Sequence, residues 1–216
     1  MKTTAGLRAG WSLIELTIIL MVLSVLTAVL VPAAGRYVRR ARVARARQDV
    51  RVLANAMLMQ LEDTGNAVFL RDGAGARSSG NRVDLLVSPG DIPVVAPEVR
   101  GADGAGWGQP PDGGKVGLLS DHLVTNTPGG SANRGYPTAA ELQGREEFAW
   151  RGPYVSPPLR ADPWGNRYAA NVGFLGASEA DCVVLSAGPN ERVESSFRAD
   201  GLVPGGDDIL CLLSAG

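Results

Sequence analysis

The sequence predicts an α+β protein, in which a long N-terminal α-helix packs on a small C-terminal antiparallel β-sheet with long loops. Three observations predict this fold class. An apolar run extends from Trp11 to Ala34, and apolar residues then recur every three or four positions up to Leu61, as on one face of a helix. The last third of the chain holds short apolar segments between glycine and proline residues, which is typical of short strands and turns.

The apolar run, taken as residues 11–35, is predicted to cross a membrane. At ~1.5 Å per residue it extends roughly 36 Å as a helix, which is enough to span a bilayer with some tilt. Its one charged residue is Glu15. An ionised carboxylate inside a bilayer costs about 2.5–3.5 kcal/mol on the more lenient insertion scale. Glu15 is therefore predicted to be a functional residue with a partner.

The residues before this run are predicted to form a leader peptide. Residues 1–10 carry Lys2 and Arg8 and end at Gly10. An ordinary secretory signal is cleaved after its apolar core, which is then lost. Here the one suitable small-residue site, Gly10, precedes the core. Cleavage after Gly10 would therefore leave the apolar helix on the mature protein.

The residues from Gly10 to Glu15 read Gly-Trp-Ser-Leu-Ile-Glu and resemble the processing site of type IV pilins and type II secretion pseudopilins. The resemblance implies that prepilin peptidase cleaves after Gly10 and methylates the new amino terminus on Trp11, where the family usually has phenylalanine. It also implies that Glu15 meets the terminal amine of a neighbouring subunit, which would set the register of a filament. A plain membrane anchor is the alternative, but it does not need a carboxylate near its start.

The helix is predicted to continue as an amphipathic segment over residues 36–63. Its apolar stripe, suited to cover a globular domain, contains Val43, Ala46, Val50, Leu53, Ala54, Met57, Leu58 and Leu61. Before Arg47, arginines lie on every side of the segment. One interpretation is that this basic stretch binds DNA or anionic lipid. We favour a solvated helix with acidic neighbours in a filament. No aromatic residues are interleaved for base stacking and the net charge is only −1, so we expect no nucleic-acid partner.

The distribution of basic residues conflicts with the topology that the resemblance implies. Arginines after the apolar run outnumber Lys2 and Arg8 before it, and the positive-inside rule would place the C-terminal side in the cytoplasm. The resemblance implies a single-pass inner-membrane protein with a periplasmic C-terminal domain, which joins a pseudopilus after assembly. We follow the resemblance, because long downstream domains translocate largely regardless of charge.

Residues 64–137 are predicted to form a variable, loop-rich region with brief strands, because glycine, proline and asparagine are dense there. Residues 138–216 are predicted to form the C-terminal β domain, and the capping-box pattern at Thr138 predicts a short helix at its start. Gly152-Pro153-Tyr154 and the segment from Asp162 to Tyr168, Asp-Pro-Trp-Gly-Asn-Arg-Tyr, resemble the C-terminal domain of the major pseudopilin of type II secretion. We assign both segments to folding, and we expect the Asn166 side chain to close its turn.

The last two predicted strands enclose a loop with two further candidate features. In the pseudopilins that the chain resembles, this loop binds calcium, and the matching positions are Asn190, Asp207 and Asp208. Calcium takes about six to eight oxygen ligands. The alternative is that Asp207 and Asp208 are solvated turn residues. Cys182 and Cys211 lie in the flanking strands and are the only cysteines. An oxidising compartment would allow a disulfide worth roughly 3 kcal/mol, and two separately buried thiols are the alternative.

No pattern typical of an enzyme is present. The single histidine, His122, is expected to pack or cap, and no metal-ligand spacing, phosphate loop or nucleophile elbow occurs. We therefore expect a structural subunit of a type II secretion-like pseudopilus that supports protein export. Its implied partners are other copies in a helical filament, prepilin peptidase, the membrane and an inner-membrane assembly platform. The alternative is a type IV pilin for adhesion, motility or DNA uptake.

Overall fold

The computed structural model describes residues 11–99, 106–107, 115–130, 133–142, 148–176, 181–197 and 204–213. The predicted leader, including Gly10, lies outside the described residues. The chain divides into two compact units, residues 1–42 and residues 43–216. The elements are α1 (Leu13–Thr64), β1 (Leu85–Val87), β2 (Val94–Val95), β3 (Val116–Leu118), α2 (Leu119–Leu123), β4 (Ala169–Ala170), β5 (Val183–Ser186), β6 (Arg192–Val193), β7 (Ile209–Leu212) and the 3-10 turns Ser79–Asn81, Pro97–Val99 and Val172–Phe174.

The long helix is confirmed as α1, a single element of 52 residues. Among the described residues it is the one helix long and apolar enough to cross a membrane. Its first part, up to Arg42, belongs to the first unit, where every described side chain is exposed. From Ala46 onward the helix buries the predicted stripe, with Ala46, Val50 and Met57 at most 1% exposed. Spacing of three and four residues puts these side chains on one face.

A five-stranded sheet forms the centre of the second unit, in the order β3-β1-β4-β5-β7. β4, β5 and β7 follow one another in antiparallel order, and β1 joins β4 antiparallel, whereas β1 and β3 are parallel. A separate pair, β2 and β6, is also parallel. The prediction of an α+β fold is confirmed, but the sheet is mixed rather than wholly antiparallel.

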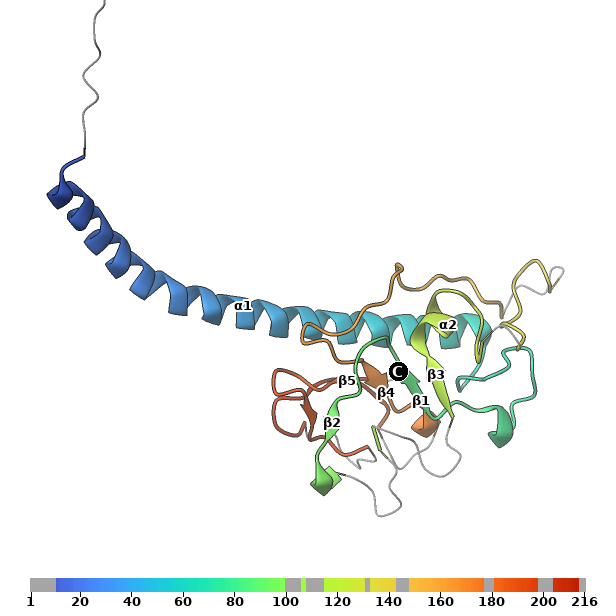
Figure 1. The fold of residues 1–216 in the computed structure, drawn as a ribbon. Coiled ribbons are helices and arrows are strands. Elements are labelled where there is room, and N and C mark those ends of the chain that lie inside the picture. Colours follow the sequence, from blue (N-terminus) through green and yellow to red (C-terminus); the bar gives the residue numbers. More distant parts are fainter. Residues whose placement is uncertain are drawn as a thin grey trace, which may run out of the picture. The chain divides into compact units, whose positions relative to one another are not determined.

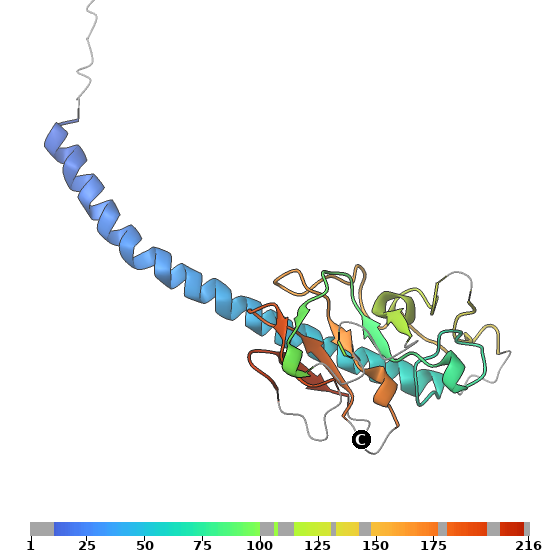
Figure 2. The ribbon, with the colours of Figure 1, turned by 60° about the horizontal axis from the view of Figure 1, so that its bottom comes forward.

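The two faces of this sheet bury different layers. Because side chains alternate along a strand, Leu86, Ala170 and Val184 face the cluster that contains the α1 stripe. Their neighbours Leu85, Ala169 and Leu185 join a second cluster with Trp107 and Phe197. Figures 1 and 2 show the part of α1 that belongs to the second unit lying against the sheet. All four residues of β5 are buried because both faces are covered.

The brief strands predicted within residues 64–137 are present as β1, β2 and β3, and the region also supplies the fully buried Phe69 and Leu119 to the core. One detail of the predicted local structure needs correction. The capping-box interaction at Thr138 does form, with its backbone N–H 2.8 Å from Glu141 Oε2. The described residues 138–142 nevertheless make a turn rather than a helix.

Candidate functional site

The start of α1 carries the processing and assembly residues predicted from the sequence. Trp11 precedes the helix and is 75% exposed. The Ser12 backbone N–H donates to Glu15 Oε2 at 2.9 Å, and the Leu16 N–H donates to the Ser12 carbonyl at 3.2 Å. Ser12 is therefore the N-cap, and Glu15 supplies one half of a capping box. A carboxylate in the first turn also interacts favourably with the helix dipole.

This contact is a role of Glu15 that the sequence prediction did not include, although the Ser-Leu-Ile-Glu spacing contains the signal. The hydrogen bond uses one carboxylate oxygen, Oε2, and the side chain remains exposed. Glu15 can thus cap its own helix and still present negative charge to another molecule. Cleavage after Gly10 would place a positive α-amine on Trp11, next to the N-cap residue.

The first unit leaves its apolar side chains uncovered. Large apolar residues from Leu13 to Val31 are between 39% and 81% exposed. Monomeric soluble proteins rarely expose an apolar surface of this extent, and such surfaces mark interaction with membrane or protein. This part of α1 is therefore a candidate surface for interaction with membrane or protein.

The predicted calcium residues lie between β5 and β7, where Asn190 and Asp208 both form hydrogen bonds with Glu194. Asn190 Nδ2 donates to Glu194 Oε2 at 2.9 Å, and Asn190 Oδ1 accepts the Arg192 N–H at 2.8 Å. Asp208 is only 8% exposed, and its Oδ2 accepts the N–H groups of Glu194 and Ser195 at 2.8 and 2.6 Å. Asp207 is exposed.

These residues do not fit a calcium shell in this arrangement. Asn190 directs its N–H₂ group toward Glu194, and an N–H₂ donor cannot serve as a calcium ligand. Among the described residues Asp208 Oδ1 is buried without a hydrogen-bond partner, whereas calcium takes about six to eight oxygens. Within the described parts of the chain, no three acidic, histidine or cysteine side chains are grouped to hold a metal. Calcium binding by this loop stays a prediction.

The two cysteines are free thiols: Cys211 lies in β7 and Cys182 directly precedes β5. Val184 is paired with Cys211 in the ladder, and the Leu213 N–H donates to the Cys182 carbonyl. Cys182 is therefore diagonal to Cys211, an arrangement with ~7–8 Å between residues, whereas a disulfide needs Cβ atoms ~3.5–4.5 Å apart. Burial also raises the pKa of Cys182 to about 12. The strand register thus favours the two-thiol alternative over the disulfide.

The segment from Asp162 to Tyr168 forms a closed turn before β4. Asp162 Oδ1 accepts the N–H groups of Trp164 and Asn166 at 3.0 and 2.9 Å, and Oδ2 accepts the Ser186 hydroxyl at 2.7 Å. Gly165 adopts a φ of 99°, which favours glycine. The side chain that closes the turn is therefore Asp162, and the prediction that Asn166 does so is wrong. The assignment of this segment to folding agrees with these bonds.

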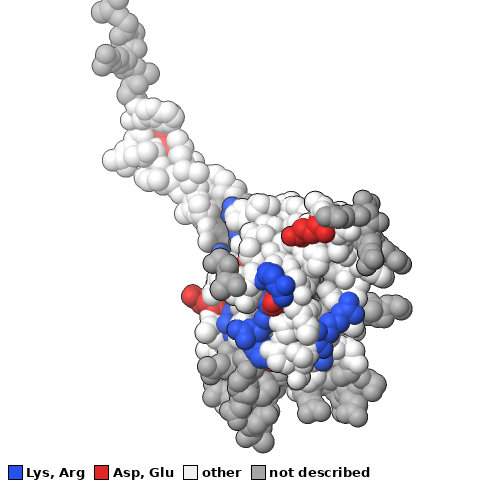
Figure 3. All heavy atoms as spheres, turned by 90° about the vertical axis from the view of Figure 1, so that its right-hand side faces the viewer, with Lys and Arg blue, Asp and Glu red and all other residues white. Residues whose placement is uncertain are grey.

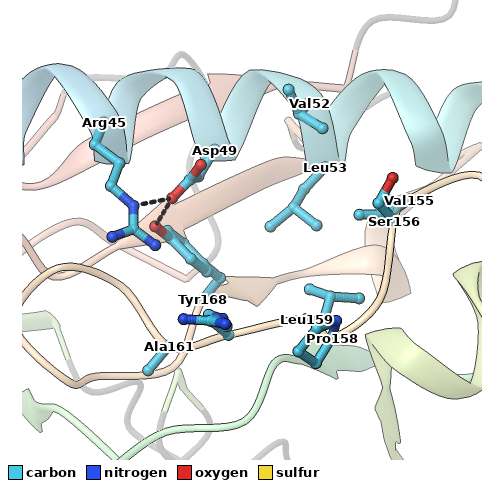
Figure 4. Close-up of a pocket in the computed structure, with 11 residues that line it drawn as sticks. Arg45, Asp49, Val52, Leu53, Val155, Ser156, Pro158, Leu159, Ala161 and Tyr168 are labelled. Carbon is cyan, nitrogen blue, oxygen red and sulfur yellow. Dashed lines mark hydrogen bonds and ion pairs between the residues drawn. The ribbon is translucent and has the colours of Figure 1, made fainter.

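The same segment is bonded to α1 across a small pocket. The Tyr168 hydroxyl donates to Asp49 Oδ2 at 2.8 Å, and Arg45 Nε lies 3.5 Å from the same oxygen. Figure 4 shows these three side chains together at one end of the pocket, with Leu53 and Leu159 in its wall. The pocket has a volume of about 180 Å³. Burial and the neighbouring Asp49 carboxylate raise the pKa of Tyr168. The three polar groups satisfy one another and fix the turn to the helix.

His122 of α2 is fully buried, as the prediction of a packing role requires. Its Nδ1 lies 3.0 Å from the Tyr136 hydroxyl, which also accepts the Leu70 N–H, and Phe69 contacts the imidazole edge-on. Burial lowers the pKa of His122 to about 3. The imidazole is therefore neutral at neutral pH and ties α2 to the segments around Phe69 and Tyr136.

Comparison with known proteins yields no relative: no protein-family model, no curated protein and no solved structure matches the chain.

Proposed function

We propose that the chain is a structural subunit of a type II secretion-like pseudopilus, processed by prepilin peptidase and assembled through its N-terminal helix to support protein export. The observation that carries the proposal is the start of α1. An apolar helix with exposed side chains begins at Leu13. Its first turn holds one carboxylate, Glu15, whose Oε2 accepts the Ser12 N–H while the side chain stays exposed. The uncovered apolar surface suits a bilayer before assembly and neighbouring helices afterwards.

The same proposal assigns roles to individual residues and a location to the protein. Prepilin peptidase would cut after Gly10 and methylate Trp11, and Glu15 would accept the Trp11 amine of the next subunit. The mature chain would cross the inner membrane once, with residues 43–216 in the periplasm. An inner-membrane assembly platform would then add subunits to the filament.

A type IV pilin for adhesion, motility or DNA uptake is the second candidate. The observation that favours it is the size of the region 64–137, whose strands β1 and β3 belong to the sheet. The secretion pseudopilin pattern does not account for this region. The two C-terminal segments around Tyr154 and Trp164 favour the secretion subunit, and the leader and helix are common to both candidates.

The test of this proposal compares Glu15→Gln with Glu15→Ala in the full chain. Glutamine can still accept the Ser12 N–H in a capping box, but it has lost the charge, whereas alanine has lost both. We expect both variants to be cleaved and inserted in the membrane but to fail in filament assembly, measured by shearing and electron microscopy. Thr17→Ala is the matched control, because Thr17 Oγ bonds only within its own helix, to the Ile14 carbonyl.

The pair of variants separates the two roles of Glu15. Normal filaments from Glu15→Gln together with none from Glu15→Ala would assign the requirement to capping and contradict the charge pairing. Normal filaments from both variants would refute the assembly role altogether.

A further inference from the structure

Four arginines follow the apolar part of α1 without any acidic residue to balance them. Arg36, Arg39, Arg40 and Arg42 are exposed on the helix. No aspartate or glutamate occurs between Glu15 and Asp49, and Asp49 already interacts with Arg45 and Tyr168. Helical neighbours three and four positions away therefore cannot neutralise these four guanidinium groups. The positive charge is available to a partner.

The position of the four arginines along α1 places them next to lipid headgroups once the helix is inserted in a membrane. The helix is continuous from Leu13, and at ~1.5 Å per residue the stretch up to Ala34 extends about 33 Å. The hydrocarbon core of a bilayer is about 30 Å thick, so the next residues emerge among lipid headgroups. Trp11 and Tyr37, 75% and 76% exposed, stand at the two ends of the stretch. Aromatic side chains are enriched at both membrane interfaces.

The spacing gathers three of the arginines on one side of the helix. Arg39 and Arg40 lie three and four positions after Arg36, within about 100° of one another around the axis. A guanidinium group binds phosphate with two parallel N–H donors. Figure 3 shows the adjoining apolar stretch of α1 as nearly free of charged side chains, in agreement with Glu15 as its one charged residue.

We propose that Arg36, Arg39 and Arg40 bind the phosphate groups of anionic phospholipids, in the leaflet at the C-terminal end of the membrane-spanning stretch. The proposal rests on the membrane insertion included in the proposed function and adds the class of lipid. Binding there would hold α1 at a fixed depth and keep Tyr37 in the interface. Adjacency to the apolar stretch favours lipid over nucleic acid, because the headgroups lie within reach of these side chains once the helix is inserted.

The experiment measures lipid selectivity of the full-length protein in phosphatidylcholine bilayers. Trace spin-labelled phosphatidylglycerol or spin-labelled phosphatidylcholine is added, and electron paramagnetic resonance gives the share of each lipid that the protein immobilises. The test variant is Arg36→Gln/Arg39→Gln/Arg40→Gln, since glutamine keeps the helix propensity. The control Arg71→Gln/Arg77→Gln/Arg160→Gln removes the same charge from exposed positions outside α1.

We expect wild type and the control to prefer phosphatidylglycerol about fivefold or more, which is the factor that one arginine near an anionic surface contributes. The test variant should lose the preference, and high salt should weaken it in wild type. Equal immobilisation of both lipids by wild type, or an unchanged preference in the test variant, would overturn the proposal.

Two further measurements separate this proposal from its alternatives. The first measurement is carbonate extraction of the membranes. If the protein is extracted from the membrane fraction, membrane insertion and the lipid site are both contradicted. A protein that stays inserted but shows no preference overturns the lipid site alone. Duplex DNA is then added to the detergent-solubilised protein. Loss of DNA binding in the test variant with an unchanged lipid preference would make the segment a nucleic-acid surface and also overturn the proposal.

Discussion

The Asp208 carboxylate holds the C-terminal loop by accepting two backbone N–H groups, while its other oxygen has no hydrogen-bond partner among the described residues. Burial raises the pKa of Asp208 above its usual range, and hydrogen bonds from Ser195 and Glu194 act in the opposite direction. A carboxyl group with a raised folded-state pKa binds its proton more readily in the folded state. Its contribution to the free energy of unfolding is therefore lost as pH rises through that pKa.

Two variants of Asp208 test this arrangement. Asp208→Ala leaves the N–H groups of Glu194 and Ser195 without an acceptor, and each unsatisfied buried group costs about 1–3 kcal/mol. Asp208→Asn keeps an acceptor and removes the buried charge. In thermal melts of the detergent-solubilised full chain at neutral pH, we expect the alanine variant to melt lower than wild type and the asparagine variant to melt at or above it.

The same melts, run with calcium and with a chelator, test the predicted metal. The predicted calcium site requires calcium to raise the melting temperature of wild type. An unchanged melting temperature in all three proteins would contradict the site and agree with the hydrogen bonds described above. A calcium-dependent rise in wild type that is absent in Asp208→Asn would show that the loop binds calcium in a different arrangement.

His122 gives the stability of the second unit a pH dependence opposite in sign to that of Asp208. Its folded-state pKa is about 3, whereas an unperturbed histidine titrates near ~6.5. The unfolded chain therefore takes up the proton first, and stability is lost as pH falls from about 6.5 toward 3. We expect wild type to lose up to about 1.4 kcal/mol per pH unit in that window relative to His122→Leu. Denaturant melts of both proteins at several pH values measure the difference, and parallel curves would contradict it.

At the scale of elements, α1 could be predicted because its signals are local. A long apolar run and a stripe such as Ala46, Val50 and Met57 follow directly from residue spacing. The Ser-Leu-Ile-Glu spacing at Ser12 and Glu15 also indicates the capping box. The closing side chain of the turn at Asp162 is not decided by residue type, because aspartate and asparagine can both bond to nearby backbone. Only the geometry distinguishes them.

The sheet was harder to predict because its strands have only two to four residues. Such segments are too short for a clear alternation, and β1 and β3 pair through contacts between distant parts of the chain. The strand register, which decides where Cys182 lies relative to Cys211, also depends on those long-range contacts. The sequence predicts both cysteines in strands, whereas only Cys211 lies in one and Cys182 directly precedes β5. Residue spacing alone does not decide whether they pair.

The β5–β7 register leads to a direct prediction about the cysteines. A thiol titration of the unfolded, never-reduced protein should count two free thiols, because diagonal positions do not bring the sulfur atoms into bonding distance. Cys211→Ser provides the reference with one thiol. A count of zero in wild type would show that the disulfide forms and that the strands shift to allow it.

At the scale of the whole molecule, the two units differ in how far their apolar side chains are covered. Residues 43–216 bury two clusters against the sheet and need no further cover for them. The described part of the first unit exposes its apolar side chains throughout, as surfaces that interact with membrane or protein do. In the proposed processing, a cut after Gly10 keeps this apolar helix on the mature chain.

The most direct test is the mass and N-terminal sequence of the mature protein, purified from the membrane of its native host. We predict loss of residues 1–10 and a first residue Trp11 that carries one N-methyl group. An intact chain that begins at Met1, or a mature chain that begins after the apolar stretch, would contradict the account of this protein as a processed filament subunit.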